Sequence, residues 1–133
     1  MQTPKFLYIS QVLAIHQDQI ISFGGTSGIR DEGLLDSALA QPQATFAGKL
    51  LHSTIHEQAA AYLYHPAMNH PFVDCNKRAA FAVMNTFITL NGYSLNLLEE
   101  EAYNLVIRVV QREISKDRVI CISRTAPTGQ VNR

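Results

Sequence analysis

The chain has 133 residues, of which 47% are hydrophobic and 17% charged, which is typical of globular proteins and not of disordered segments. This length suits a single domain over residues 1–133 with a hydrophobic core of its own. Lys and Arg balance Asp and Glu at 11 each. The balance excludes a general attraction to nucleic acid or to anionic membranes, so we expect any anion-binding site to be local.

Neither a secretory signal pattern nor an apolar run of about 18 residues is visible, so we expect a cytoplasmic protein without a membrane partner. The two cysteines, Cys75 and Cys121, have neither metal-site spacing nor a C-x-x-C arrangement. We therefore treat both as reduced thiols.

The first 42 residues predict two helices joined by a flexible turn. Apolar residues at mostly helical spacing follow Ser10 and stop at Gly24. Three glycines within residues 24–28 suit a turn or a small hairpin, because glycine readily adopts positive φ. Asp31 is placed to cap a short second helix, which should end before Pro42 because proline lacks the N–H that a helix needs.

The rest of the chain predicts further helices and no strand long enough for a sheet. Pro66 should kink or end the next helix, and Gly92 should close the helix after it. This later helix is apolar over most of its surface, so we expect it to be central and buried. The fold expected is an all-α bundle with at most one small hairpin, near Gly24. The helices are predicted at about 53–66, 77–91, 99–111 and 115–123, with a frayed tail over about 124–133.

Residues 70–78 combine an imidazole, a carboxylate, a carboxamide, an ammonium and a guanidinium just ahead of a predicted helix. The first N–H groups of a helix lack intrahelical partners and form the positive end of its dipole. Lys77 and Arg78 add two cations at this end, where cations are disfavoured. A bound phosphate would resolve the conflict.

That phosphate would give Asp74 and His70 their roles. Mg²⁺ commonly bridges bound phosphates and takes one or two carboxylates as ligands, which makes Asp74 the candidate metal ligand. His70 is the residue of the loop that accepts a proton near neutral pH. It can therefore deprotonate a hydroxyl group that attacks a phosphoryl group.

Each of these residues, taken alone, also has a structural interpretation. Asp74 or Asn76 can be a helix N-cap, and His70 can be a hydrogen-bonded loop residue. Phe72 fits a core anchor that fixes the loop under either interpretation. The two cations can be ordinary surface charges. The functional interpretation therefore rests on the combination.

The run His-Pro-Phe-Val-Asp-Cys-Asn-Lys-Arg at residues 70–78 closely resembles the Fic/Doc signature, His-x-Phe-x-Asp/Glu-small-Asn-Lys/Gly-Arg. The eighth place of the run is Lys77, and a lysine at this place resembles the death-on-curing (Doc) branch of that family. The resemblance covers about residues 8–122, and it is clear at 28–35, 59–64 and 90–93.

The resemblance implies a compact all-α Fic fold that binds ATP at the signature loop. His70 would be the general base, and Asp74 would hold Mg²⁺. Residues at about 22–30 would form the flap that positions a target peptide. The phosphates would be bound by Cys75, Asn76, Lys77 and Arg78.

The resemblance also implies a function. Most Fic enzymes transfer AMP to a protein hydroxyl, whereas Doc-type members with Lys at the place of Lys77 are associated with transfer of the γ-phosphate. The chain would then be the toxin of a toxin–antitoxin pair, a protein kinase that phosphorylates a hydroxyl, a threonine, of translation elongation factor Tu and arrests translation. A separate antitoxin would inhibit it. The alternatives are an AMP transferase and an inactive nucleotide-binding or partner-binding module.

Two residues leave alternatives open. Cys75 stands where the signature usually has glycine, and its Cβ disfavours positive φ, so it either serves as a small filler or spoils the turn. Its thiol near two cations and a helix N-terminus can also be reactive. Arg30 either reaches the phosphates from the flap side or simply flanks the Asp31 cap.

Overall fold

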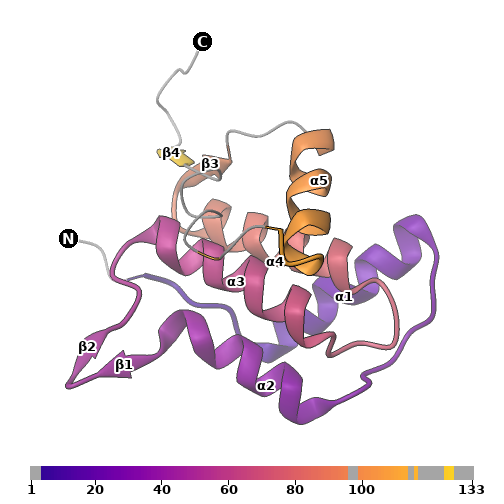
Figure 1. Cartoon of the computed structure of the whole chain (residues 1–133), viewed down its shortest axis with the longest axis horizontal. Helices are drawn as coiled ribbons and strands as arrows, with labels where there is room; N and C mark the ends of the chain where they lie inside the picture. Colours follow the sequence, from indigo (N-terminus) through magenta and orange to yellow (C-terminus); the bar gives the residue numbers. More distant parts are fainter. Residues whose placement is uncertain (1–3, 96–98, 114–115, 117–124, 128–133) are drawn as a thin grey trace.

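The computed structural model describes residues 4–95, 99–113, 116 and 125–127. Its elements follow the chain in the order that Figure 1 shows. The helices are α1 (Ile9–Phe23), α2 (Glu32–Ala40), α3 (Ile55–Asn69), α4 (Asn76–Leu90) and α5 (Glu99–Val110), with a short 3-10 helix at Gln41–Gln43. The strands are β1 (Thr45–Phe46), β2 (Lys49–Leu50), β3 (Tyr93–Leu95) and β4 (Thr125–Pro127).

Two helices, α3 and α4, form the centre of the molecule and pack most extensively on each other. α2 lies against α3, α1 lies against α4, and α5 contacts both central helices (Figure 1). Buried alanines on α3 and α4 leave little side-chain bulk on either helix, so the two backbones can approach closely. These alanines are Ala59, Ala60, Ala61, Ala67, Ala79 and Ala80.

The large side chains of the core come mainly from the two central helices. α4 buries Val83, Met84, Phe87 and Ile88, as expected for a helix that is apolar over most of its surface. Tyr62 of α3 packs against Phe87 with ring centroids 4.7 Å apart and ring planes tilted by 41°. The prediction of an all-α bundle with a central, buried fourth helix is confirmed.

The small hairpin lies elsewhere than expected. Residues 24–28 form no strand pair with each other, whereas β1 and β2 pair as an antiparallel hairpin with Thr45 opposite Leu50. Its turn contains Ala47 and Gly48, both at positive φ. Of the turn and the small hairpin considered for residues 24–28, the structure has no hairpin there, because this segment pairs with a distant loop.

The helix ends show two further differences. α3 continues past Pro66 to Asn69, so of the two effects predicted for this proline, a kink or a helix end, the helix end is wrong. Thr125–Pro127, expected to be frayed, pairs with Tyr93–Leu95 as an antiparallel strand. The predicted helix at 115–123 lies outside the described residues, apart from Lys116, which is helical.

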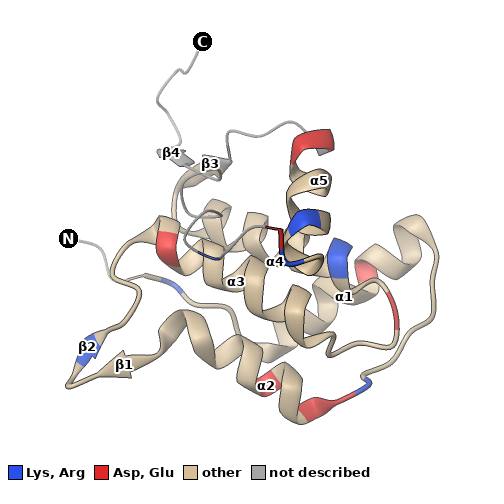
Figure 2. Ribbon diagram, viewed as in Figure 1, with Lys and Arg blue, Asp and Glu red and all other residues tan. Residues whose placement is uncertain are grey.

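Charged residues are mixed along the described chain, and Figure 2 shows acidic and basic positions interspersed over the helices. No helix within the described ranges combines the length and the apolar character needed to cross a bilayer. Because the charges are mixed, an anion-binding site must be local, and the candidate is the loop between α3 and α4.

Candidate active site

The loop that joins α3 to α4 is bracketed by two residues in the left-handed helical conformation. His70 ends α3 at φ 49° and ψ 56°, and Cys75 precedes α4 at φ 62° and ψ 30°. This conformation costs a non-glycine residue about 1–2 kcal/mol, so the surrounding structure must hold both residues there. Cys75 therefore does adopt the turn that a glycine would adopt at this place.

Phe72 anchors the loop in the core, as predicted. Its side chain is only 2% exposed, and the amide of Asn76 brackets its backbone. Asn76 Oδ1 accepts a hydrogen bond from the Phe72 N–H at 2.9 Å, and Asn76 Nδ2 donates to the Phe72 carbonyl at 3.0 Å. The side chain of Asn76 thus holds the loop, and a phosphate-binding role for this residue rests on its main-chain N–H.

The N-terminus of α4 has no side-chain cap. Cys75 is its N-cap residue and makes no capping hydrogen bond, so the alternative interpretation of Asp74 or Asn76 as the N-cap does not hold. The first N–H groups of α4 have no helical partner, and Lys77 and Arg78 stand beside them, both exposed. Lys77 and Arg78 outnumber the single carboxylate of Asp74, so this end of α4 carries net positive charge, which favours binding of an anion.

Asp74 is exposed, but its carboxylate is held by two main-chain groups. Oδ2 accepts a hydrogen bond from the Thr26 N–H at 3.0 Å, and Oδ1 accepts one from the Cys75 N–H at 2.8 Å. The bond from Thr26, followed by that from Cys75, lowers the pKa of Asp74 below its ordinary value. The carboxylate is therefore charged at neutral pH and fixed in direction.

The glycine-rich segment after α1 lies along the signature loop. Ile29 and Phe72 form an antiparallel bridge, and the Val73 N–H donates to the Gly28 carbonyl at 3.0 Å. A Cβ added at Gly25 would lie 2.8 Å from Cys75 Sγ and 2.9 Å from Asp74 Oδ2. Since φ at Gly25 is also positive (133°), glycine is required there for the segment to reach Asp74.

Arg30 has a different role from either one considered above. Its Nε donates to the His70 carbonyl at 2.7 Å, and its Nη2 donates to the Asn69 carbonyl at 3.0 Å. The guanidinium therefore caps the C-terminus of α3, where carbonyl groups lack partners and a positive charge is favoured. Asp31 caps α2 independently by accepting a hydrogen bond from the Leu34 N–H, as predicted.

The loop opens onto a cleft of about 300 Å³. Seven residues of the run at 70–78 line the cleft, together with Tyr103 of α5. The lining residues are His70, Val73, Asp74, Cys75, Asn76, Lys77, Arg78 and Tyr103. The fold thus brings the imidazole, the carboxylate and both cations to one cavity.

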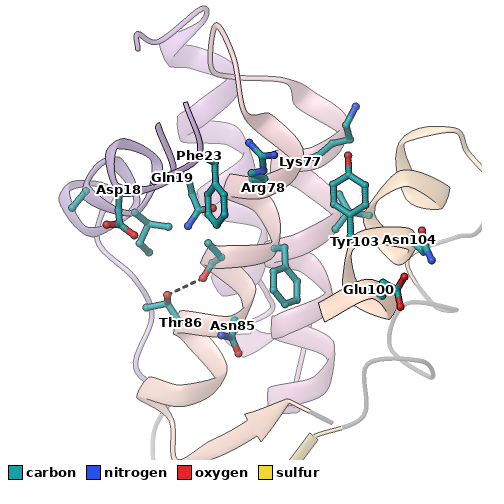
Figure 3. Close-up of a pocket in the computed structure, with 15 residues that line it drawn as sticks. Asp18, Gln19, Phe23, Lys77, Arg78, Asn85, Thr86, Glu100, Tyr103 and Asn104 are labelled. Atoms are coloured by element: carbon teal, nitrogen blue, oxygen red, sulfur yellow. Dashed lines mark hydrogen bonds between the residues drawn. The ribbon is translucent and has the colours of Figure 1, made fainter. Parts of the chain in front are cut away.

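A larger cavity of about 980 Å³ adjoins this cleft between α1, α4 and α5, and the two share Lys77, Arg78 and Tyr103. Figure 3 shows Arg78 beside Phe23 on one wall, with Lys77 and Tyr103 next to each other on the opposite side. The Arg78 guanidinium lies over the Phe23 ring, 4.8 Å from its centroid. Of these two cavities, only the smaller cleft is lined by His70 and Asp74.

The cleft suits a divalent cation that takes one carboxylate of the protein as a ligand and completes its shell with other oxygens. Within the described ranges, no three His, Cys, Asp or Glu side chains gather closely enough to hold a metal ion by themselves. Mg²⁺, however, usually takes one or two carboxylates and completes its shell with phosphate oxygens and water. The charged, exposed carboxylate of Asp74 beside the N-terminus of α4 supplies the protein ligand of that arrangement.

Several residues at or near the site belong to no motif that the sequence displays. His16 and Ile20 share the buried face of α1 with Val12, and this i, i+4, i+8 spacing was the one signal that His16 would be buried. Thr26 acts through its main-chain N–H, which sequence does not display. Tyr103 reaches the cleft only because α5 packs on α4.

Comparison with known proteins agrees with this geometry. Residues 6–88 match the Fic/DOC family. The chain is 41% identical to Toxin Doc of Mycolicibacterium smegmatis over 101 residues, which cover 74% of this chain and 78% of that protein. It is 29% identical to Protein kinase doc of Escherichia phage P1 over 109 residues, or 82% of this chain and 85% of that protein. The chain therefore belongs to the Fic/DOC family, in its death-on-curing branch.

Proposed function

We propose that the chain is a Doc-type toxin that transfers the γ-phosphate of ATP to a hydroxyl group of a protein, a threonine of translation elongation factor Tu. The names of the two relatives, a toxin and a protein kinase, support the general activity. The observation that carries the proposal is the cleft itself, which gathers an imidazole, a charged carboxylate and two cations at one helix N-terminus. This target acts in the cytoplasm, so the proposal includes a cytoplasmic toxin.

His70 is the proposed general base. His70 lines the cleft and its carbonyl is held by Arg30, so the backbone is fixed and the imidazole would lie beside a substrate bound there. The imidazole takes the proton of the attacking hydroxyl as the oxygen forms a bond to the γ-phosphorus. The bond between that phosphorus and the β,γ-bridging oxygen breaks, and ADP leaves. A base in this position contributes about 10²–10⁴ to the rate.

The N-terminus of α4, Lys77 and Arg78 are the proposed phosphate site. Main-chain N–H groups and a helix dipole bind phosphate oxygens, and the two side chains add charge-assisted hydrogen bonds. When bound at Asp74, Mg²⁺ would neutralise negative charge on the phosphates. The hydrogen bonds from Thr26 and Cys75 keep this carboxylate ionised and aimed into the cleft.

A separate antitoxin protein is the proposed inhibitor. The cavity of about 980 Å³ presents apolar side chains, Ile15, Phe23 and Phe81 among them, next to Lys77 and Arg78. A protein segment seated in this cavity would cover the two cations and displace the phosphates. Inhibition by occupation of this cavity requires no change in the fold.

The alternative to γ-phosphate transfer is transfer of AMP, and labelled nucleotide separates the two. The purified chain is incubated with elongation factor Tu and with ATP labelled at either the α or the γ position. We expect label from the γ position on the acceptor protein and none from the α position. Retention of the α label without the γ label would replace the kinase with an AMP transferase.

An inactive module is the remaining alternative, and the variant His70→Asn separates it from an enzyme. We expect expression of the wild-type chain alone to arrest growth and the variant to be harmless. If wild-type and variant are equally harmless and neither label is transferred, the chain is a binding module. The adoption of the left-handed turn by Cys75 argues against that outcome, because the loop is built despite the missing glycine.

A further inference from the structure

We propose that His16 is a positioning residue for the transfer reaction, which fixes the Asp74 carboxylate by holding the peptide group between Asp74 and Cys75. The proposal rests on the proposed function, because it concerns the carboxylate assigned there to the Mg²⁺–nucleotide complex. It goes beyond that function by assigning a catalytic consequence to a buried side chain of α1, outside the signature.

His16 is buried, with 4% of its surface exposed, and it makes two directed contacts with the signature loop. Its Nε2 lies 2.8 Å from the Asp74 carbonyl oxygen, and its ring stacks on Phe72 with centroids 3.7 Å apart and planes 6° from parallel. A carbonyl oxygen only accepts hydrogen bonds, so the proton of the neutral imidazole must be on Nε2.

The peptide group between Asp74 and Cys75 transmits this contact to the carboxylate. The peptide is planar, so its carbonyl and its N–H point in opposite directions and turn together. The carbonyl accepts the bond from His16, and the N–H donates to Asp74 Oδ1 at 2.8 Å. When the bond from His16 is lost, the peptide group is released, and with it the N–H that orients the carboxylate.

The turn that follows α1 holds the other carboxylate oxygen, Asp74 Oδ2. Thr26 follows α1 by three residues, and its N–H donates to Asp74 Oδ2. Asp74 is thus held at its main chain by α1 and at its side chain by the turn after α1. His16 does not line the cleft, so it acts through Asp74 and has no contact with substrate.

Two substitutions separate hydrogen bonding from packing. His16→Phe keeps an aromatic ring against Phe72 but removes the donor, whereas His16→Gln supplies an amide N–H at similar reach. Val12→Ala is the matched control, because Val12 lies one turn earlier on the buried face of α1 and is 1% exposed. This control loses core packing and leaves the contact with Asp74 intact.

The readout is Mn²⁺ binding in the presence of a non-hydrolysable ATP analogue, followed by the electron paramagnetic resonance signal of free Mn²⁺. We expect His16→Phe to weaken Mn²⁺ binding about fivefold to tenfold, which corresponds to one lost hydrogen bond. We expect His16→Gln to stay within about twofold of the wild type. Val12→Ala should lower the melting temperature and leave Mn²⁺ binding unchanged. Equal Mn²⁺ affinities for the wild type, His16→Phe and Val12→Ala would overturn the proposal.

A measurement on the wild-type chain keeps the proposal falsifiable if His16→Phe does not fold. Nitrogen NMR of the imidazole should show the proton on Nε2, and a ring with Nε2 unprotonated would overturn the proposal. The two hypotheses fail separately. A wild type that binds Mn²⁺ and nucleotide without transferring phosphate contradicts the proposed function alone, whereas a wild type that binds no Mn²⁺ with nucleotide contradicts both.

Discussion

The guanidinium of Arg30 and the carbonyl of His70 are joined by a hydrogen bond of 2.7 Å from Nε, across 40 residues of sequence. A second bond, from Nη2, reaches the carbonyl of Asn69 at 3.0 Å. The proposed base is therefore tied through its own backbone to the segment that runs beside the signature loop. Arg30 therefore holds the backbone at the start of the loop and does not line the cleft.

Replacing Arg30 by Lys tests this support. Lysine keeps the charge but lacks the planar fork that reaches two carbonyls, so we expect the free energy of unfolding to fall by about 1 kcal/mol. We also expect a lower kcat with little change in the KM for ATP, because the base is displaced and the phosphate site is not. Urea denaturation and steady-state kinetics measure the two effects. Arg108→Lys on the exposed side of α5 is the control, and equal losses in both variants would contradict the prediction.

His70→Asn should lower the rate of phosphate transfer by about 10²-fold or more while leaving the fold intact. Asparagine tolerates the left-handed conformation that His70 adopts, so the substitution removes the base without adding much backbone strain. Circular dichroism checks the fold, and calorimetry checks that ATP still binds. A variant that retains half of the wild-type rate would exclude His70 as the base.

Substitutions at Cys75 should rank by backbone strain and not by thiol chemistry. Cys75→Ser should keep wild-type activity, and Cys75→Gly should stay within about 1 kcal/mol of wild-type stability, because relief of strain offsets the added freedom of the unfolded chain. Cys75→Val should lose about 1–2 kcal/mol, because a β-branched residue is strongly disfavoured at positive φ. Thermal unfolding and label transfer measure the series. Loss of activity in Cys75→Ser alone would instead indicate a reactive thiol.

Acid should destabilise the protein through His65. Burial, followed by the charges of Lys116 and His52, lowers the pKa of His65 to about 4 from an ordinary value of 6.5. Between these two values the unfolded chain binds a proton that the folded chain does not, so the free energy of unfolding decreases as the pH falls through this window. The stabilisation is complete above 6.5 and is lost by about 4.

Urea titrations at pH 7 and pH 5 check this dependence. With allowance for the partial exposure of His65, we expect a difference of about 1 kcal/mol in the free energy of unfolding. His65→Gln should flatten the difference, because glutamine does not titrate and can still accept a hydrogen bond from Lys116 Nζ, which lies 3.3 Å from His65 Nε2. An unchanged difference in this variant would assign the pH dependence to other groups.

The sequence predicts those parts of the site that depend on neighbouring residues. The helices follow from local apolar spacing, and the cluster of charges at residues 70–78 is contiguous, so its position before α4 could be inferred directly. The choice between a turn and a small hairpin for the glycine-rich segment could not be made locally, because its partners, Pro71 and Val73, lie more than 40 residues away. The real hairpin at 45–50 has strands of two residues each, too short for an alternating pattern to show.

Side-chain contacts between residues far apart in the sequence were the least predictable. Arg30 precedes Asp31, so proximity in the sequence suggested a role at the α2 cap, whereas its guanidinium points to the end of α3. His16 and Asp74 are 58 residues apart, and only the packing of α1 on α4 brings them together. Pro66 shows the same principle, since tertiary packing keeps α3 helical beyond a residue that local rules place at a helix end.

The left-handed conformations of His70 and Cys75 have a consequence for the thermodynamics of nucleotide binding. The energetic cost of the strained backbone at both ends of the loop is offset by the free energy of folding, before any ligand binds. Binding then requires little ordering of the loop, so most of the interaction energy of the phosphates appears as affinity. Under the proposed function the loop would be a preorganised receptor, and we expect nucleotide to associate with a small loss of conformational entropy.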